Sequence, residues 1–197
     1  MCGFYLRIGE IDFDEKALIN KIAGRGTSPV RMANGFVNKA PFSVAHARLN
    51  INGATDLQPV ITDGYVFVYN GSIYNWDELN GQTCDKFMSD TQLLAHICDC
   101  SRCRRFYDTI VGSFAACKLD LKENVVEIFR DGFFQKPLHS LVNKSSLIVS
   151  SWIAAPETGE RFTPDQRIDF RNIGHGIPNT DFSNYRDRIS VDLKNFA

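Results

Sequence analysis

Cys2 is the residue of this sequence best suited to chemistry, because it directly follows Met1 in the opening "MCGFY". Position 2 is small enough for Met1 to be trimmed away, which would leave a thiol and a free α-amine on one residue. Such a residue carries a nucleophile together with its own base. The alternative is an inert small residue at the start of a strand, since most cysteines are structural. The opening residues alone favour that alternative.

A second candidate is the pair Asn70-Gly71, which ends an apolar stretch in "YNGSIYN". A glycine lets a backbone N–H approach a ligand closely. The side-chain amide of Asn beside an exposed N–H makes an oxyanion hole with two donors. The alternative is a plain Asn-Gly turn, which is common.

Two charged residues could bind the ends of a zwitterion. Arg48 in "HARLNI" follows a predicted strand, where its guanidinium could hold a carboxylate with two hydrogen bonds. Asp90 in "MSDTQLL" stands at a predicted helix start, where the helix dipole stabilises a carboxylate. Its free oxygen could hold an ammonium group. Each residue also has an ordinary explanation, as a surface arginine and as a helix N-cap.

The elements that must position these residues are helices interleaved with two sets of antiparallel strands. Hydrophobic periodicity and turn residues predict helices over 14–23, 74–81 and 89–100. They predict strands over 4–8 and 42–51, and hairpins over 59–71, 113–131 and 136–151. Residues 24–41 are rich in Gly, Ser, Asn and Pro and are predicted to be a loop. This pattern suits two stacked sheets flanked by helices.

The bulk properties bound the class of protein. The chain has 197 residues, 44% of them hydrophobic, which is enough for one domain with a real core. A net charge of -1 provides no basic field for nucleic acid, and no apolar run is long enough to span a membrane. The opening residues are unlike a secretory signal, and the six cysteines are unevenly spaced. We therefore expect free thiols and a cytoplasmic location.

Taken in order, these residues resemble the class II glutamine amidotransferases, which are N-terminal-nucleophile hydrolases, and most closely the glutaminase domain of asparagine synthetase. The segments that carry the resemblance are "MCGF", "HARLNI", "LQPVITDGYVFVYNGSIYN", "SDTQLL", "IVGSFAACKLD" and "FRDGFFQKPLHS". The resemblance implies an α+β fold of four layers, αββα, built from two mainly antiparallel sheets. It implies an amidotransferase domain over residues 1–155, with residues 156–197 as a C-terminal extension packed on the same domain.

The resemblance also implies a reaction, the hydrolysis of L-glutamine to L-glutamate and ammonia. The Cys2 thiolate would attack the side-chain amide, its α-amine would move the proton, and Asn70 and Gly71 would hold the oxyanion. Arg48 would pair with the substrate α-carboxylate and Asp90 with the α-ammonium. A terminal amine with a pKa of about 8 is a competent base near neutral pH. No step needs a metal or a cofactor, and none is expected.

The sequence departs from the family pattern at several positions. Ser72 follows the Asn-Gly pair, where the asparagine synthetase branch has a Glu that helps to bind substrate. Ser72 is therefore a candidate substrate-binding residue. The exchange is expected to alter the affinity for substrate or the choice of substrate. The family's "RGPD" is "RGTSP" over residues 25–29, and the Tyr of its "PLY" is His139. The sequence also lacks a Ser-Gly-Gly-rich pyrophosphate loop. We therefore expect the ammonia to pass to a separate ATP-dependent synthetase.

Several alternatives stay open. The chain could be a non-catalytic glutamine-binding or scaffold module that retains the fold, or a different N-terminal-nucleophile amidohydrolase. The segment "HICDCSRC" contains thiols at metal-ligand spacing, but no second Cys pair follows and Cys98 would point away from the other two, so we expect no metal there. His46 is expected to be a packed strand histidine, and His175 a loop residue.

Overall fold

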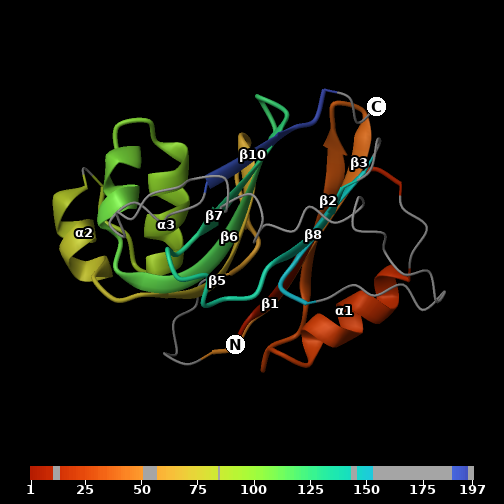
Figure 1. Cartoon of the computed structure of the whole chain (residues 1–197), viewed down its shortest axis with the longest axis horizontal. Coiled ribbons are helices and arrows are strands. Elements are labelled where there is room, and N and C mark those ends of the chain that lie inside the picture. Colours follow the sequence, from red (N-terminus) through yellow and green to blue (C-terminus); the bar gives the residue numbers. More distant parts are fainter. Residues whose placement is uncertain (11–13, 51–56, 84, 143–145, 153–187, 195–197) are drawn as a thin grey trace, which may run out of the picture.

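Two five-stranded antiparallel sheets form the centre of the protein (Figure 1). The computed structural model describes residues 1–10, 14–50, 57–83, 85–142, 146–152 and 188–194. Sheet A has the order β2-β3-β1-β9-β8, with β1 (Gly3–Ile8), β2 (Arg31–Val37), β3 (Ala40–Ala47), β8 (His139–Val142) and β9 (Leu147–Ser150). Sheet B has the order β10-β7-β6-β5-β4, with β4 (Val60–Ile61), β5 (Tyr65–Ile73), β6 (Gly112–Asp120), β7 (Val125–Arg130) and β10 (Arg188–Asp192).

Helices cover the outer faces of both sheets, which confirms the predicted αββα layering. Helix α1 (Glu15–Ala23) lies on sheet A, while α2 (Trp76–Gln82), α3 (Asp90–Asp99) and the 3₁₀ helix η1 (Arg104–Thr109) lie on sheet B (Figure 1). The largest apolar cluster fills the space between the sheets, and a smaller cluster lies under each helical layer. No helix in the described ranges is long and apolar enough to cross a membrane.

Alternation along β1 explains why this strand is central. Phe4, Leu6 and Ile8 belong to the core between the sheets, whereas Tyr5 packs on the other face with residues of α1. Side chains two apart in a strand share a face. Cys2 precedes β1 with the same parity as Phe4, so its side chain belongs to the face that looks toward sheet B.

The helix boundaries follow their capping residues. The Asp14 side chain accepts a hydrogen bond from the Ala17 N–H at the start of α1, and Gly24 follows its last residue, as predicted. Ser89 caps α3 through the Gln92 N–H, so Asp90 is the first helical residue. Helix α2 continues one residue beyond the predicted end at Gly81.

The predicted loop over residues 24–41 is wrong in its second half, where β2 forms an edge of sheet A. An edge strand is held by backbone pairing and needs only a weak apolar face. Met32 and Phe36 of β2 are indeed exposed, and Asn34 and Gly35 are poor strand formers. Two further elements, η1 and β10, were absent from the sequence prediction. β10 lies within residues 156–197 and pairs with β7 along sheet B.

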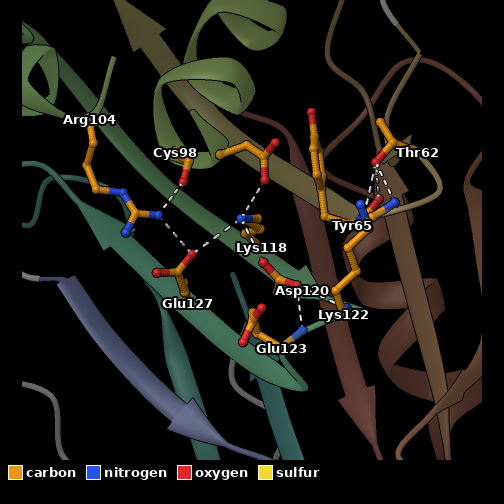
Figure 2. A network of polar contacts seen from close by, with 11 residues as sticks. Thr62, Tyr65, Cys98, Arg104, Lys118, Asp120, Lys122, Glu123 and Glu127 are labelled. Carbon is orange, nitrogen blue, oxygen red and sulfur yellow. Dashed lines mark hydrogen bonds and ion pairs between the residues drawn. The ribbon is translucent and has the colours of Figure 1, made fainter. Parts of the chain in front are cut away.

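A polar network lies on the helix-covered face of sheet B (Figure 2). Lys118 of β6 is only 2% exposed, and its ammonium contacts Asp99 at 2.8 Å, Asp120 at 3.1 Å and Glu127 at 3.6 Å. Burial opposes the charge, but the hydrogen bonds and charges of Asp99 and Asp120 raise the pKa of Lys118 above its ordinary value. Arg104 completes the network by contacting Glu127 at 3.5 Å. We name these five residues the Lys118 network.

Candidate active site

Cys2 lies at the start of β1, beside the end of β3. The pairing of Gly3 with Ala47 places Cys2 opposite Arg48 as the register continues. The Leu49 N–H donates a hydrogen bond of 3.3 Å to the Cys2 sulfur. The Cys2 side chain is half-buried, so solvent or a substrate can reach the sulfur.

The strand that follows Cys2 is fixed by a buried serine. Ser151, at the end of β9, accepts a hydrogen bond of 2.8 Å from the Phe4 N–H through Oγ, and its own N–H donates to the Phe4 carbonyl at 2.9 Å. The Ser151 carbonyl also accepts a bond of 2.7 Å from Arg25. Arg25 stacks against Trp152 as well, with its guanidinium 5.7 Å from the ring centre. These contacts hold the N-terminal segment in one position.

The segment that replaces the family's "RGPD" lies against Arg48. The N–H groups of Thr27 and Ser28 donate to the Arg48 carbonyl at 2.7 and 3.1 Å, and the Asn50 N–H donates to the Thr27 hydroxyl. A Cβ at Gly26 would lie 2.7 Å from the Arg48 carbonyl oxygen, so only glycine allows this approach. The altered segment therefore lies beside the arginine that the sequence predicts to bind a carboxylate.

Asn70 supplies a buried donor that is unpaired in the described part of the chain. Asn70 is 1% exposed, and its Nδ2 has no hydrogen-bond partner in that part of the chain. Alternation along β5 places Asn70 on the face shared by Val66 and Val68, which packs toward sheet A. An unpaired buried amide costs roughly 1–3 kcal/mol, so this donor requires an explanation.

The backbone of Gly71 points to the edge of sheet B. Phe114 uses both its N–H and its carbonyl to bind Asp131, so its pairing with Gly71 is of the type without mutual hydrogen bonds. The Gly71 N–H consequently points away from β6, toward the β4 side. Strand β4 pairs only with Val66 and Phe67, so the edge at Gly71 lies beyond its end.

Neighbouring groups along that same edge are occupied. The Tyr69 N–H donates to the Gln58 side chain at 2.7 Å, and the Tyr69 carbonyl contacts His46 Nε2 at 3.2 Å. The Ile73 N–H donates to Asp90 at 3.2 Å. Gly71 lies between these two occupied positions, and no bond to its N–H is found within the described ranges. A Cβ at Gly71 would lie 2.6 Å from Phe114 Cα, so glycine is required here by close packing.

Asp90 is oriented by β5. Its Oδ2 accepts hydrogen bonds from the Tyr69 hydroxyl at 2.9 Å and from the Ile73 N–H at 3.2 Å. Burial, followed by the charge of Asp90, raises the pKa of Tyr69 well above its ordinary value, so the hydroxyl remains a donor. Both bonds use the same oxygen, and no hydrogen bond to Oδ1 is found in the described part of the chain.

His46 links the two sheets next to the candidate donors. It is buried on β3, and its Nε2 contacts the Tyr69 carbonyl. Burial lowers the pKa of His46 to about 4, with the charge of Arg48 acting in the same direction. The ring is therefore neutral near pH 7, and the carbonyl contact makes Nε2 the protonated nitrogen. This is the packed strand histidine that the sequence predicted.

The predicted site residues fall into two groups at one end of the sheets. Cys2 and Arg48 lie side by side on sheet A, and Asn70, Gly71 and Asp90 lie on or against the end of β5. The His46–Tyr69 contact ties the two groups together. Ser72 is exposed on β5, and no contact of its side chain with this group is found in the described part of the chain. Sequence reasoning missed Tyr69 and Gln58. The only indication in the sequence is that Tyr69 directly precedes the Asn-Gly pair and that Gln58 belongs to the segment "LQP".

Comparison with known proteins decides the family. A family model described as "Glutamine amidotransferase domain" matches residues 46–156, which is more than half of the chain. The chain belongs to this family. The matched range contains Arg48, Asn70, Gly71 and Asp90, while Cys2 and β1 precede it. The placement of Cys2 in this amidotransferase domain therefore comes from the structure.

Named relatives agree with this assignment. The amidotransferase domain is 35% identical over 101 residues to "Asparagine synthetase [glutamine-hydrolyzing] 2" of Bacillus subtilis (strain 168), a match that covers 49% of this chain and 13% of that protein. It is similar in fold to glutamine phosphoribosylpyrophosphate amidotransferase from B. subtilis, with a TM-score of 0.57 and 16% identity. A structure titled as the allosteric regulatory enzyme of purine biosynthesis matches with a TM-score of 0.58 and 16% identity. Each fold match covers 76% of this chain and 42% of the other.

Proposed function

We propose that this amidotransferase domain hydrolyses L-glutamine to L-glutamate and ammonia, with Cys2 as its nucleophile once Met1 has been removed. The observation that carries the proposal is the pair of donors at the end of β5, Asn70 Nδ2 and the Gly71 N–H. In the described part of the chain neither donor has a hydrogen-bond acceptor, whereas the backbone N–H groups of Tyr69 and Ile73 on the same strand do. Donors held in place before a reaction are the main requirement for stabilising an oxyanion. They lie on the same end of the sheets as the Cys2 thiol.

The first half of the reaction forms a thioester. The Cys2 thiol gives its proton to the Cys2 α-amine, and sulfur attacks the side-chain carbonyl carbon of glutamine. Asn70 and Gly71 donate hydrogen bonds to the oxygen that becomes negative. The C–N bond then breaks, the amine returns its proton to the leaving nitrogen, and ammonia departs.

The second half releases glutamate. Water loses a proton to the same α-amine and attacks the thioester carbon, and the oxyanion again occupies the two donors. The C–S bond breaks, and the proton returns to the sulfur. Met1 would block this cycle, because it converts the α-amine into an amide without basicity.

Two charges select the substrate. Arg48 beside Cys2 is assigned to the α-carboxylate, and Asp90 Oδ1 to the α-ammonium group. A cation and an anion at a fixed separation favour a zwitterionic amino acid over a simple amide. Ser72 is exposed and belongs to the outer rim of this set, so we assign it a minor role in binding.

The ammonia is proposed to serve a separate ATP-dependent synthetase. The curated relative named above carries a glutamine-hydrolysing synthetase activity in its name, and the match spans only 13% of its length. A partner would supply the acceptor chemistry. We also propose a cytoplasmic location, because the described cysteines carry free thiols, which persist in a reducing compartment.

A second candidate function is a glutamine-binding module without turnover. Ser72 supports it, because a Glu at this position in the asparagine synthetase branch helps to bind substrate. This candidate keeps the Arg48 and Asp90 contacts but needs no reaction at Cys2.

Glutamate release from glutamine by Met1-free protein distinguishes the two candidates. The proposal predicts turnover that Cys2→Ala abolishes, while Cys2→Ala still binds glutamine in calorimetry. Equal binding by both proteins with no release from either, with or without an added synthetase, would leave only the binding module. Mass spectrometry of the N-terminus establishes in each sample that Met1 is absent.

A further inference from the structure

A cluster of metal-ligating side chains lies at the far end of α3 from Asp90. His96 belongs to the last turn of α3, Cys100 follows its end, and Cys103 precedes η1. One ligand atom from each of the three lies within 4.8 Å of the other two. The helix rises by about 1.5 Å per residue, so His96 lies about 9 Å and Cys100 about 15 Å along the axis from Asp90. It is thus distinct from the candidate active site.

We propose that His96, Cys100 and Cys103 bind one borderline-soft transition-metal ion, Zn²⁺ being the best match. Two thiolates and one imidazole are the donor types that zinc prefers, and their charge balances a divalent cation. Three protein ligands leave a fourth tetrahedral position for water or another small ligand.

The distances are close to those of a coordinated ion. Bond lengths of about 2.3 Å to sulfur and 2.0–2.1 Å to nitrogen place tetrahedral ligand atoms roughly 3.5–3.8 Å apart. Cys103 Sγ and His96 Nε2 are already 3.4 Å apart. All three ligand atoms lie within 4.8 Å of one another, so a shift of no more than about 1 Å is needed, which a side-chain rotation at Cys100 can supply.

The backbone holds the ligands in this arrangement. The Cys100 N–H donates to the His96 carbonyl at 2.8 Å, which continues the helix by one bond. The Cys100 carbonyl then accepts from the N–H groups of Cys103 and Arg104, both at 3.0 Å. This tight turn folds the C-x₂-C segment back toward the helix, so both sulfurs face His96. In a helix continued through residue 103, Cys103 would lie on the same face as His96 but about 10 Å farther along the axis, too far to share one ion.

Burial around the cluster fits a metal that enters from solvent. Cys103 is buried in the core beneath the helices, whereas His96 and Cys100 are half-exposed. The His96 ring also packs on Phe87, with ring centres 4.8 Å apart, which limits its rotation. The bound ion would tie α3 to η1, and its role would be to stabilise this layer rather than to take part in glutamine chemistry.

Cobalt titration of the reduced protein tests the site, because thiolate–Co²⁺ contacts give an intense charge-transfer absorption. We expect one Co²⁺ per chain, displaced by Zn²⁺, and a melting temperature that rises with Zn²⁺ concentration. Cys100→Ser and His96→Gln, both at half-exposed positions, should each weaken binding by more than about tenfold. Cys2→Ala removes an accessible thiol elsewhere and should bind as the wild type does.

Three results would overturn the proposal. One is reduced wild-type protein without the charge-transfer band and without a Zn²⁺-dependent melting temperature. The second is binding that Cys100→Ser and His96→Gln leave unchanged. The third is that Cys100 and Cys103 form a disulfide in the isolated protein and that the two thiols do not bind Co²⁺ after the disulfide has been reduced. The melting temperature of the wild type needs no variant, so misfolding of a variant does not obscure the outcome.

Discussion

Two buried polar sites on opposite faces of sheet B differ in how their central group is paired. On the helix-covered face, the buried Lys118 ammonium reaches three carboxylates within 3.6 Å, and Arg104 contacts one of them. At the end of β5 that meets sheet A, Asn70 Nδ2 is buried without a partner in the described part of the chain. Folding alone explains the first arrangement, because buried charges must be paired. The second costs free energy, and a bound ligand would explain it.

The comparison separates structure from function in measurable terms. Changes in the Lys118 network should alter the free energy of unfolding and spare the reaction. Changes at the β5 end should alter the reaction and spare stability. The variants that follow test this division, together with the His46 contact between the sheets, from the largest expected effect to the smallest.

Asn70→Ala removes one oxyanion donor. We expect kcat for glutamine hydrolysis to fall by about 10²–10³, since this is the usual cost of losing such a donor. The free energy of unfolding should change by less than about 1 kcal/mol in either direction, because no hydrogen bond within the described structure is lost. Asn34→Ala on the exposed edge strand is the control and should change neither. A fall in stability with unchanged kcat would reverse the assignment.

Lys118→Met breaks the Lys118 network on the other face. Glu127 then stays buried without its contact to the Lys118 ammonium, and we expect a loss of about 3 kcal/mol in the free energy of unfolding, measured by urea denaturation. The kcat of the folded variant should stay within about twofold. Lys122→Met, at a neighbouring exposed lysine, should change stability by less than about 0.5 kcal/mol. A large kcat loss in folded Lys118→Met would contradict a purely structural role.

His46 makes the junction between the sheets sensitive to acid. Its pKa is about 4 in the folded chain and about 6.5 when unfolded, so the unfolded state takes up a proton that the folded state does not. The free energy of unfolding should therefore decrease as pH falls from about 6.5 to about 4, by at most about 3 kcal/mol from this group. His46→Gln should flatten that part of the stability curve. An identical slope in wild type and variant would show that His46 is not buried as a neutral ring.

Asp90→Asn tests the ammonium contact. We expect KM for glutamine to rise by about tenfold, equivalent to about 1.4 kcal/mol, with kcat changed by less than about threefold. Asp77→Asn, in the exposed first turn of α2, is the matched control and should leave both constants unchanged. If Asp90→Asn lowered kcat alone, Asp90 would act on the reacting groups and not on the substrate's amine.

The sequence predicted most of the central fold because its signals are local. Phe4, Leu6 and Ile8 alternate along β1, and the Asp63-Gly64 turn joins β4 to β5 as expected. Edge strands were harder. β2 is held by pairing with β3 and carries little apolar pattern of its own, and in β10 the alternation of Ile189 and Val191 with polar residues spans only five positions. Residues 31–37 form a strand because they pair with β3, and that pairing is not visible in the sequence of the segment itself.

The candidate site was predictable in its residues but not in its geometry. Cys2, Arg48, Asn70, Gly71 and Asp90 were each weak signals, and their order identified a family pattern. What the sequence could not supply is the set of long-range contacts: the Tyr69 hydroxyl on Asp90, Gln58 on the Tyr69 N–H, and Ser151 on Phe4. The Phe4–Ser151 contact joins residues 147 positions apart, beyond the reach of any local pattern. The turn that brings Cys100 and Cys103 to His96 was missed for a related reason, because the helix ends between them.

Covalent labelling tests the central claim, that Cys2 is the nucleophile of the processed chain, most directly. A glutamine analogue with an electrophilic diazoketone in place of the amide would be incubated with Met1-free protein and mapped by peptide mass spectrometry. The account predicts one adduct per chain on Cys2, slowed by Asn70→Ala and prevented by excess glutamine. Buried Cys117 should stay unmodified, because burial raises the pKa of its thiol. An adduct on Cys100 or Cys103 instead of Cys2, or equal labelling of protein that retains Met1, would contradict the account.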